Sequence, residues 1–566
     1  MAFSDAVGND TWLQQITMAA YRVYDTVAMS AATHRVFNQP PPLAGYNLFT
    51  TDAVLREGVA RCDADWALPD LHAFGAALGE EETMRDGFLA NEYPPVLETH
   101  DRFGRRRDEI EFHPAWHHLM RLSVAQGAHA LPWSDPRPGG HVARAALMML
   151  AGENEAGHLC PLSMTYSAIP VLRLDPALAA EWESTVVSRR YDPRFRPVRE
   201  KTGALIGMGM TEKQGGSDVR ANTTLAEPAG GLEYRITGHK FFCSAPMSDA
   251  FLILAQAPRG LTCFFLPRWT PDGEVNAFHL QRLKRKLGNR SNASGEVEYR
   301  GAWARRIGEE GRGVATIMEM VQHTRLDCSI GSTALMRRAL VEAVHHARHR
   351  AAFGRLLADQ PLMRAVLADL AMETEAAQLA TLRIARAFDR RASENALARL
   401  LVAAAKFWIC KRAPAMIAEA LECLGGSGYV EESILPRLYR EAPVNSVWEG
   451  SGNVICLDVL RAVRKEPEAV EALVGELRET RGLDAAYDRG LGALETALGD
   501  ADETRARALT EAMAKLLQAS LMLRWSPAAA TFCATRLGPD GGATFGALPA
   551  GADAQAIVDR AFPETR

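Results

Sequence analysis

Three short β-rich segments interrupt a chain whose composition is otherwise that of helices. They are LEYRITG (232–238), AFLILAQA (250–257) and LTCFFLP (261–267), rich in β-branched and aromatic residues. A proline–arginine–glycine turn at 258–260 separates the last two. The sequence therefore predicts a β domain over about residues 207–303, placed between helical regions.

The regions on both sides predict helices. VARAALMMLAGENEAGHLC (142–160) is rich in Ala and Leu and predicts one helix before the β domain. Long amphipathic stretches after it predict a helical bundle: 335–350, 361–388 and 396–411. We expect an α+β multidomain protein with an N-terminal helical domain (1–206), a middle β-barrel domain (207–303), a helical bundle domain (304–465) and a C-terminal helical extension with a loose, Gly/Pro/Ala-rich tail (466–566).

Composition excludes several classes of protein. The net charge is −5 and the pI is near 6.3, so the whole chain has no signature for nucleic acid or membranes. Nine cysteines without a C-x-x-C pair argue against a disulfide framework and a zinc site, and we expect no metal. The first ten residues lack the basic start of a signal peptide, and no apolar stretch approaches the ~18 residues of a spanning helix. We expect a cytoplasmic protein.

Four motifs are candidates for ligand contacts, and each has a plain structural alternative. GMGMTEKQGGSD (207–218) offers free backbone N–H groups and hydroxyls to a phosphate or a flavin edge, although a Gly-rich turn would look the same. HKFFCSAP (239–246) is either a ligand-facing or an ordinary core strand end. RHRAAFG (348–354) presents an arginine that either clamps a pyrophosphate or lies on the surface. LECLGGSGYVEE (421–432) closes a helix, which capping alone would explain.

The order and spacing of these motifs resemble the acyl-CoA dehydrogenase family of flavoproteins. TE…GSD, K-x-aromatic-x-S, R-x-x-F-G, LGG-x-GY and WEG-S follow one another on an α–β–α layout. MGMTEKQGGSDV, KLGNRSNAS, EFHPAWHHLM and LPRLYREAPVNSVWEGSGN are similar to the branch of the family that includes the adaptive alkylation-response proteins. The resemblance covers about residues 30–465 and is weaker beyond them.

The resemblance implies that FAD is the cofactor. Thr211 would face its pyrimidine edge and Ser217 its pyrophosphate, while Phe242 would lie against the isoalloxazine and Ser244 near N5. Some of the positions would serve the FAD of a neighbouring subunit, so the resemblance also implies a homo-oligomer, most simply a homotetramer. The residues assigned to FAD are Met210, Thr211, Gly216, Ser217, Phe242, Cys243, Ser244, Arg350, Phe353, Gln360, Gly425, Gly426, Val447, Trp448, Gly450, Ser451 and Asn453.

WEGSGN (448–453) would carry the catalytic base. In the family a glutamate before glycine abstracts the α-proton of an acyl thioester while hydride leaves the β-carbon for flavin N5. That glutamate is Glu449 here, with Arg325 as the second catalytic residue. Another branch places its base before an Arg-Leu pair, where this chain has Thr324, so the nearest alternative acid is Asp327. A helix-start charge is the structural alternative for Glu449.

A tryptophan in place of the usual tyrosine at 448 implies a narrower pocket, and therefore short or branched acyl groups. The resemblance implies an acyl-CoA dehydrogenase activity and a role in the response to DNA alkylation. Two alternatives are a DNA-associated protection protein with a largely structural flavin, and a flavin oxidase acting on small nitro or alkyl compounds.

The tract QRLKRKLGNR (281–290) adds a possible contact with polyanions through Arg282, Lys284, Arg285 and Lys286. Such a run is either a solvated face, a site for the phosphates of CoA, or a contact for the backbone of double-stranded DNA. The C-terminal segment 465–566 has 11 Lys and Arg against 16 Asp and Glu, a net charge of −5, and predicts a poor phosphate partner.

Overall fold

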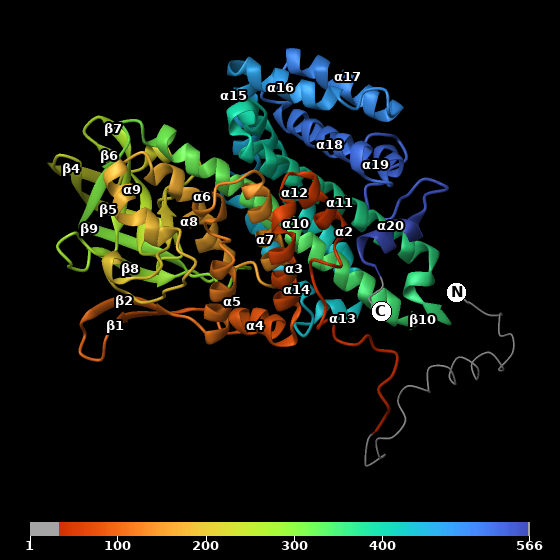
Figure 1. Cartoon of the computed structure of the whole chain (residues 1–566), viewed down its shortest axis with the longest axis horizontal. Helices are drawn as coiled ribbons and strands as arrows, with labels where there is room; N and C mark the ends of the chain where they lie inside the picture. Colours follow the sequence, from red (N-terminus) through yellow and green to blue (C-terminus); the bar gives the residue numbers. More distant parts are fainter. Residues whose placement is uncertain (1–32, 564–566) are drawn as a thin grey trace.

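The computed structural model describes residues 33–563 and has the predicted helix–barrel–helix order (Figure 1). Residues 1–32 lie outside the described residues. They include the start of the predicted N-terminal domain and the ten residues that argued against a signal peptide. The N-terminal elements are α2 (Ala53–Arg61), α3 (Leu68–Gly79), α4 (Glu81–Glu92), β1 (Val96–His100), β2 (Arg106–Glu111), α5 (Pro114–Ala125), α6 (Leu131–Ser134), α7 (Gly140–Asn154), α8 (Leu159–Leu172) and α9 (Pro176–Val186).

The middle segment is a closed β-barrel. Its strands are β3 (Ile206–Gly209), β4 (Leu225–Gly230), β5 (Glu233–Ser244), β6 (Ala250–Ala257), β7 (Gly260–Pro267), β8 (Phe278–Leu283) and β9 (Ser294–Ile307). The sheet order β3-β6-β4-β5-β9-β7 closes because β6 also pairs with β7, and β8 adds to β9. Strand pairing around the ring leaves few open edges, and aromatic and branched side chains fill the interior.

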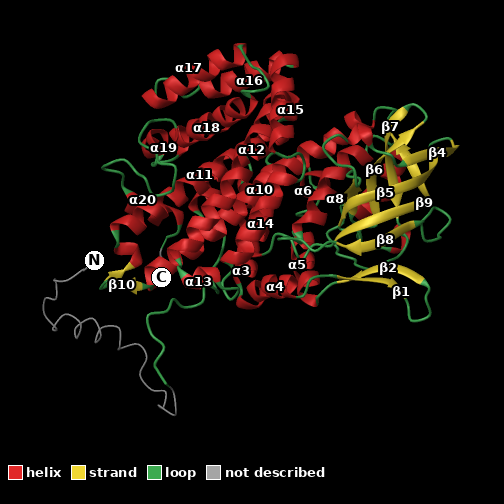
Figure 2. Cartoon of the chain, turned by 180° about the vertical axis from the view of Figure 1, so that it is seen from behind, coloured by secondary structure: helices red, strands yellow, loops and turns green. Residues whose placement is uncertain are grey.

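Long helices form the bundle, which lies beside the barrel (Figures 1 and 2). The helices Gly313–His349 and Arg391–Cys423 are longer than the stretches 335–350 and 396–411 that predicted them, because apolar residues recur in the more polar sequence beside those stretches. The elements are α10 (Gly313–His349), the hairpin β10 (Ala351–Ala352) and β11 (Arg355–Leu356), α11 (Pro361–Asp389), α12 (Arg391–Cys423), α13 (Gly426–Tyr429), α14 (Leu435–Val447) and α15 (Gly452–Lys465). The predicted domain limits at 206, 303 and 465 stay predictions.

The extension stacks on one side of the bundle (Figure 2). It comprises α16 (Pro467–Arg478), α17 (Ala485–Gly499), α18 (Ala506–Trp525), α19 (Ala529–Arg536) and α20 (Ala554–Ala561). The prediction of a loose tail is wrong for its end. Ile557 and Val558 of α20 are buried, and Arg560 forms ion pairs with Glu57 at 2.7 Å and Glu375 at 3.3 Å.

The stretch 142–160 is helical as predicted but is interrupted, because the chain breaks between α7 and α8. The Glu155 carboxylate accepts the backbone N–H groups of Gly157 and His158 at 2.8 Å each, at the start of α8. A side-chain acceptor of this kind satisfies N–H groups that a continuing helix would have bonded to its own carbonyls. A stretch rich in Ala and Leu carries no sequence signal for such a break.

Three hydrophobic cores organise the fold. The largest joins the N-terminal helices, the bundle and the extension. The barrel interior is a second core. The third lies where α8, one face of the barrel and α10 meet, and Met210 and Trp448 pack against it. Within residues 33–563 no helix is long and apolar enough to cross a membrane, and no group of three His, Cys, Asp or Glu could hold a metal ion. All nine cysteines are buried and unbridged.

Candidate active site

The WEGSGN segment forms the turn between α14 and α15, where the chain takes two left-handed residues in succession. Glu449 has φ +58° and Gly450 has φ +103°. Left-handed backbone at a residue with a side chain costs roughly 1–2 kcal/mol. Surrounding contacts must therefore hold Glu449 in this conformation.

Two buried cations hold the turn by its carbonyl groups. Lys406 of α12 donates from Nζ to the carbonyl oxygens of Trp448 at 2.9 Å and Gly450 at 2.5 Å. Arg325 of α10 donates from Nε to the carbonyl oxygen between them, that of Glu449, at 3.1 Å. Three successive carbonyls thus accept from charged donors, which are stronger than neutral ones.

Arg325 is itself fixed by Asp458 of α15. Its Nη1 lies 2.7 Å from the Asp458 carboxylate, which also binds Arg399 at 2.8 Å and Arg461 at 2.7 Å. Burial alone would raise the pKa of Asp458, but the charges of Arg325 and Arg399 hold it well below the usual value. Asp458 therefore stays ionised and keeps Arg325 directed at the turn.

The carboxyl group of Glu449 is positioned to act as a base. Its Oε2 accepts a hydrogen bond from the Thr324 hydroxyl at 2.6 Å. Burial raises its pKa above the usual value, against the opposing effects of the Thr324 hydrogen bond and the charges of Lys406 and Arg325. A carboxylate with a raised pKa in a water-poor site is suited to proton abstraction near neutral pH.

Asp327, the alternative acid, is unsuited to that task. Both of its oxygens accept from the buried Arg144, at 2.6 and 2.8 Å, in a bidentate pair. The Arg144 guanidinium also lies over the Tyr166 ring, 3.4 Å from the centroid. Asp327 is thus committed to the packing of α7 against α10.

The barrel presents the flavin-type motif on the same side as Glu449. The Thr211 carbonyl accepts from the N–H of Phe241, and a fully buried Lys240–Glu212 ion pair of 2.8 Å fixes the segment behind it. At the end of β5, Ser244 lies near the thiol of Cys160, and the charge of Glu449 acts on the same thiol. The structure therefore brings the predicted Ser244 and Glu449 close to one small group.

Other predicted residues lie around these two. Phe242 is 44% exposed, and Cys243 is fully buried, so its side chain faces the barrel core. Gly216 is close to Thr211, since a Cβ there would lie 2.4 Å from its hydroxyl. Ser217 and Val447 are exposed, and Ser451 precedes the first turn of α15 without a side-chain cap.

A second set of predicted residues lies at the other end of α10. Arg350 follows that helix, 25 residues beyond Arg325, which is about 38 Å of helix. The Arg350 side chain donates to the carbonyl of Asn38 at 2.7 Å, and Gln360 donates to that of Ala352 at 3.0 Å. Phe353 is 99% exposed, and the Gly425-Gly426 turn is open to solvent. Within one chain these residues do not meet Glu449.

The extension reaches the turn through one residue that the sequence did not indicate. Arg507 of α18 donates from Nη1 to the side-chain oxygen of Asn453 at 2.7 Å. Lys406, Asp458 and Arg507 were all missed. The signal for Lys406 was available, because a lone lysine inside the apolar run LLVAAAKFWIC needs carbonyl or acid partners.

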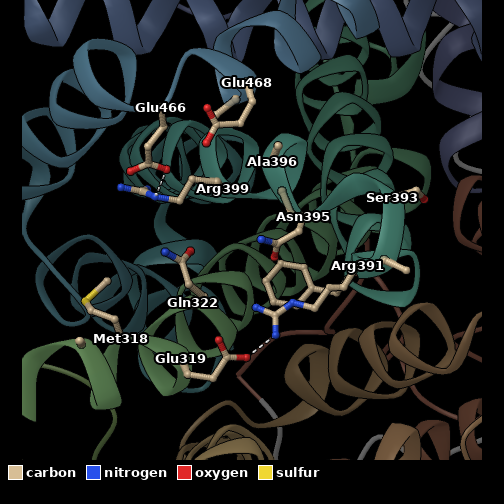
Figure 3. A pocket seen from close by; sticks show the side chains of 15 residues that line it. Met318, Glu319, Gln322, Arg391, Ser393, Asn395, Ala396, Arg399, Glu466 and Glu468 are labelled. Atoms are coloured by element: carbon tan, nitrogen blue, oxygen red, sulfur yellow. Dashed lines mark hydrogen bonds and ion pairs between the residues drawn. The ribbon is translucent and has the colours of Figure 1, made fainter. Parts of the chain in front are cut away.

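A cavity of about 510 Å³ lies along the same face of α10, one turn before Arg325. Figure 3 shows Glu319 paired with Arg391 and Arg399 paired with Glu466 at its wall. Two buried polar atoms of this wall, Gln322 Oε1 and Arg391 Nε, find no hydrogen-bond partner within residues 33–563. Both atoms lie behind the cavity surface, so they are not open to a molecule inside it.

The basic tract 281–290 is open to solvent in part. Arg282 and Lys284 both pair with Glu296, at 2.7 and 2.6 Å. The ammonium of Lys286 points inward, to a carbonyl and a hydroxyl. Arg285 is exposed. The inward Lys286 ammonium cannot reach the backbone of DNA, but the side chains of Arg282, which is 67% exposed, and Arg285 are open to solvent. A contact of the tract with the phosphates of DNA or CoA stays a prediction.

Comparison with known proteins identifies the class. The model of the "Adaptive response protein AidB N-terminal domain" matches residues 38–193, that of the "Acyl-CoA dehydrogenase, middle domain" matches 207–302, and that of the "Acyl-CoA dehydrogenase, C-terminal domain" matches 311–464. The chain belongs to the acyl-CoA dehydrogenase family, FAD-dependent oxidoreductases that act on CH–CH bonds. The predicted family, fold and cofactor are confirmed.

Individual proteins are similar to the chain over most of its length. The chain is 48% identical to "Putative acyl-CoA dehydrogenase AidB" of Escherichia coli (strain K12), over 90% of this chain and 95% of the relative. It is 30% identical to "Acyl-CoA dehydrogenase family member 11" of Caenorhabditis elegans, over 79% and 75% of the two chains. The structure of Caenorhabditis elegans ACDH-11 in complex with C11-CoA superposes with a TM-score of 0.81 at 27% identity, covering 94% of this chain and 93% of that one.

The residues present fit FAD. An aromatic ring at Phe242 is open for stacking, hydroxyls stand at Thr211 and Ser244, and the first turn of α15 offers backbone N–H groups at Gly452. These groups match the ring, the polar edge and the phosphates of a flavin dinucleotide. FAD supplies a hydride acceptor when it is bound here.

Replacing Lys406 with methionine should destabilise the protein. The variant leaves the carbonyls of Trp448 and Gly450 without their donor, at about 1–3 kcal/mol for each buried group. We expect a lower midpoint in chemical denaturation. The control Lys515→Met, which removes a surface i,i+4 pair with Glu511, should change the unfolding free energy by no more than about 0.5 kcal/mol. Equal midpoints for the two variants would contradict the role of Lys406 in holding the turn.

Proposed function

We propose that the protein oxidises an acyl-CoA-type thioester between its α and β carbons, with Glu449 as the base. The observation that carries the proposal is the half-buried, hydroxyl-bonded carboxyl of Glu449, whose pKa burial raises and which is held in a left-handed turn beside the Ser244 end of β5. The α C–H bond breaks and its proton passes to Glu449. Hydride leaves the β carbon for FAD, and a carbon–carbon double bond forms between the two carbons.

The remaining side chains of the turn position the reacting groups. We propose that the N–H of Glu449 binds the thioester oxygen, where negative charge develops during proton abstraction. Arg325 touches the Glu449 backbone rather than an open site, so we assign it a positioning role in place of direct catalysis. Trp448, whose indole donates to Asn445 at 3.1 Å, would limit the pocket to short or branched acyl groups.

Glu449→Gln tests the base directly. Glutamine keeps the shape and the contact with Thr324 but accepts no proton. We expect the purified variant to retain FAD with an unchanged visible spectrum. Its anaerobic bleaching by acyl-CoAs that reduce the wild-type flavin should be slower by a factor on the order of 10² to 10⁴.

The matched control for this variant is Glu375→Gln. Glu375 is another buried glutamate whose pKa burial raises, and it lies on α11 beside Arg560. The Glu375→Gln variant should bleach at the wild-type rate. If Glu449→Gln also bleaches at the wild-type rate, the base is a different residue. If Glu449→Gln loses its flavin, a structural role for the turn is favoured.

Thr324→Val should shift the pH dependence of the reaction. The Thr324 hydroxyl stabilises the charged form of Glu449, so its removal raises the pKa of that carboxyl further. Because the base acts only when deprotonated, the acidic limb of the bleaching rate should move to higher pH, while the rate at high pH stays near that of the wild type. A Thr324→Ser variant, which keeps the hydroxyl, should retain the wild-type profile. An unmoved limb in Thr324→Val would exclude Glu449 as the titrating base.

We also propose that the protein is a homo-oligomer in which a second copy covers the β10–β11 hairpin. Phe353 sits at the hairpin tip with φ +52° and Gly354 follows with φ +79°, which is the backbone of a tight hairpin turn. The turn directs a phenylalanine fully into solvent, next to Leu356 and near the 84% exposed Leu362. Exposed apolar side chains that lie close together in this way are typical of protein–protein interfaces.

Phe353→Asp should therefore dissociate the oligomer. A carboxylate placed in an apolar contact is strongly unfavourable. Light scattering should give a smaller mass than for the wild type, with loss of FAD if Arg350 of one copy serves the cofactor of another. Leu483→Asp, at a 61% exposed apolar residue of the extension, should keep the wild-type mass. A wild-type protein that is monomeric with full FAD content would refute the proposal.

A role in the response to DNA alkylation is a second candidate, and the identity to AidB is the observation that favours it. The inward direction of Lys286 takes one cation from the tract for which DNA contact was inferred, and Glu296 neutralises part of the charge of Arg282 and Lys284. We therefore place the dehydrogenase chemistry first.

A further inference from the structure

Lys286, in the connection between β8 and β9, holds an ammonium group in the interior beside neutral partners. Its Nζ donates to the carbonyl of Asn292 at 2.6 Å and to the hydroxyl of Ser294 at 2.9 Å. Within residues 33–563 no carboxylate forms an ion pair with it, and burial lowers its pKa to about 8. An ammonium bound directly only to neutral groups gains less than one in an ion pair, so stability alone does not explain its position.

Two carboxyl groups and a thiol face Lys286 and act on its charge, although none of them forms an ion pair with its ammonium within residues 33–563. Glu441 of α14 accepts from the backbone and side-chain N–H groups of Asn289, at 2.5 and 2.6 Å. Glu155, between α7 and α8, accepts from Ser291 at 2.7 Å and from the start of α8. The Cys160 thiol of α8 is the third, and burial raises its pKa to about 12, so it stays neutral.

The position of Lys286 connects it to the reacting groups. Its partner Ser294 stands opposite Ser244 in the β5–β9 register. Four groups influence the pKa of the Cys160 thiol and therefore lie near it: Lys286, Asn292, Ser244 and Glu449. Ser294 and the Cys160 thiol therefore lie between the Lys286 ammonium and Ser244, beside which the proposed function requires FAD.

We propose that Lys286 is a positioning residue that supplies the fixed positive charge of the flavin site. It orients the Ser244 end of β5 through Ser294, and its ammonium stabilises the negative charge that hydride transfer brings to the cofactor. The substrate gives one proton to Glu449 and two electrons with the second hydrogen to FAD, so one negative charge remains near Ser244. This inference rests on the proposed function, because it requires FAD at that strand.

The test compares holoproteins in anaerobic equilibrium with a reference redox dye. Lys286→Gln keeps a donor for Ser294 or Asn292 and removes the charge. At pH 7 the ratio of reduced to oxidised flavin should fall about tenfold or more, the size of effect expected from loss of one nearby buried charge. In the wild type, the ratio should also fall further as pH rises through about 8, where Lys286 loses its proton. The variant should lack that additional fall.

Arg285→Gln is the matched control, because it removes an exposed cation one residue away and should leave the ratio unchanged. If Lys286→Gln does not retain FAD, Lys286→Arg should restore both FAD and the wild-type ratio. A low ratio in that arginine variant, or a wild-type ratio in Lys286→Gln at every pH, overturns the inference and leaves the proposed function intact. A wild-type protein that binds no FAD overturns both.

Discussion

The fixation of three backbone carbonyls by two buried cations is the interaction on which the active site depends. Lys406 and Arg325 come from different long helices and meet the turn between two others. Each cation exchanges its hydration for carbonyl oxygens, which is favourable only if the carbonyls stay in place. The turn, the base and the helices are consequently coupled, and the strained φ of Glu449 is offset by contacts that no local sequence preference provides.

A chain of charges extends this coupling across the bundle. Asp458 joins Arg325 to Arg399, and Arg399 also pairs with Glu466, at the wall of the cavity. On the opposite side of the turn, Arg507 holds Asn453. The turn therefore has supports from α10, α12, α15 and α18, so the extension is part of the active-site structure and is not an independent appendage.

The sequence predicted those features that depend on local patterns. The strand over 250–257 was predicted at its observed limits, because an apolar run bounded by turn residues has few alternatives. Family motifs led to Glu449 and to FAD. By contrast, the Arg325–Asp458 pair joins residues 133 apart, and the burial of Lys286 depends on packing against α8 and α14. A run of cations such as 282–286 looks like a solvated face until the fold turns one of them inward.

The return of α20 to the beginning of the chain has a consequence for how the molecule is made. Arg560 binds Glu57, 503 residues earlier, and Arg337 donates to the carbonyl of Ala561. The last helix thus seals the first helical layer against the bundle. Contacts of such sequence separation form late and slowly. On the ribosome, α2 and α11 emerge long before α20, so the apolar surface that α20 covers stays open until that helix has been synthesised, and binding by chaperones would matter most in this period.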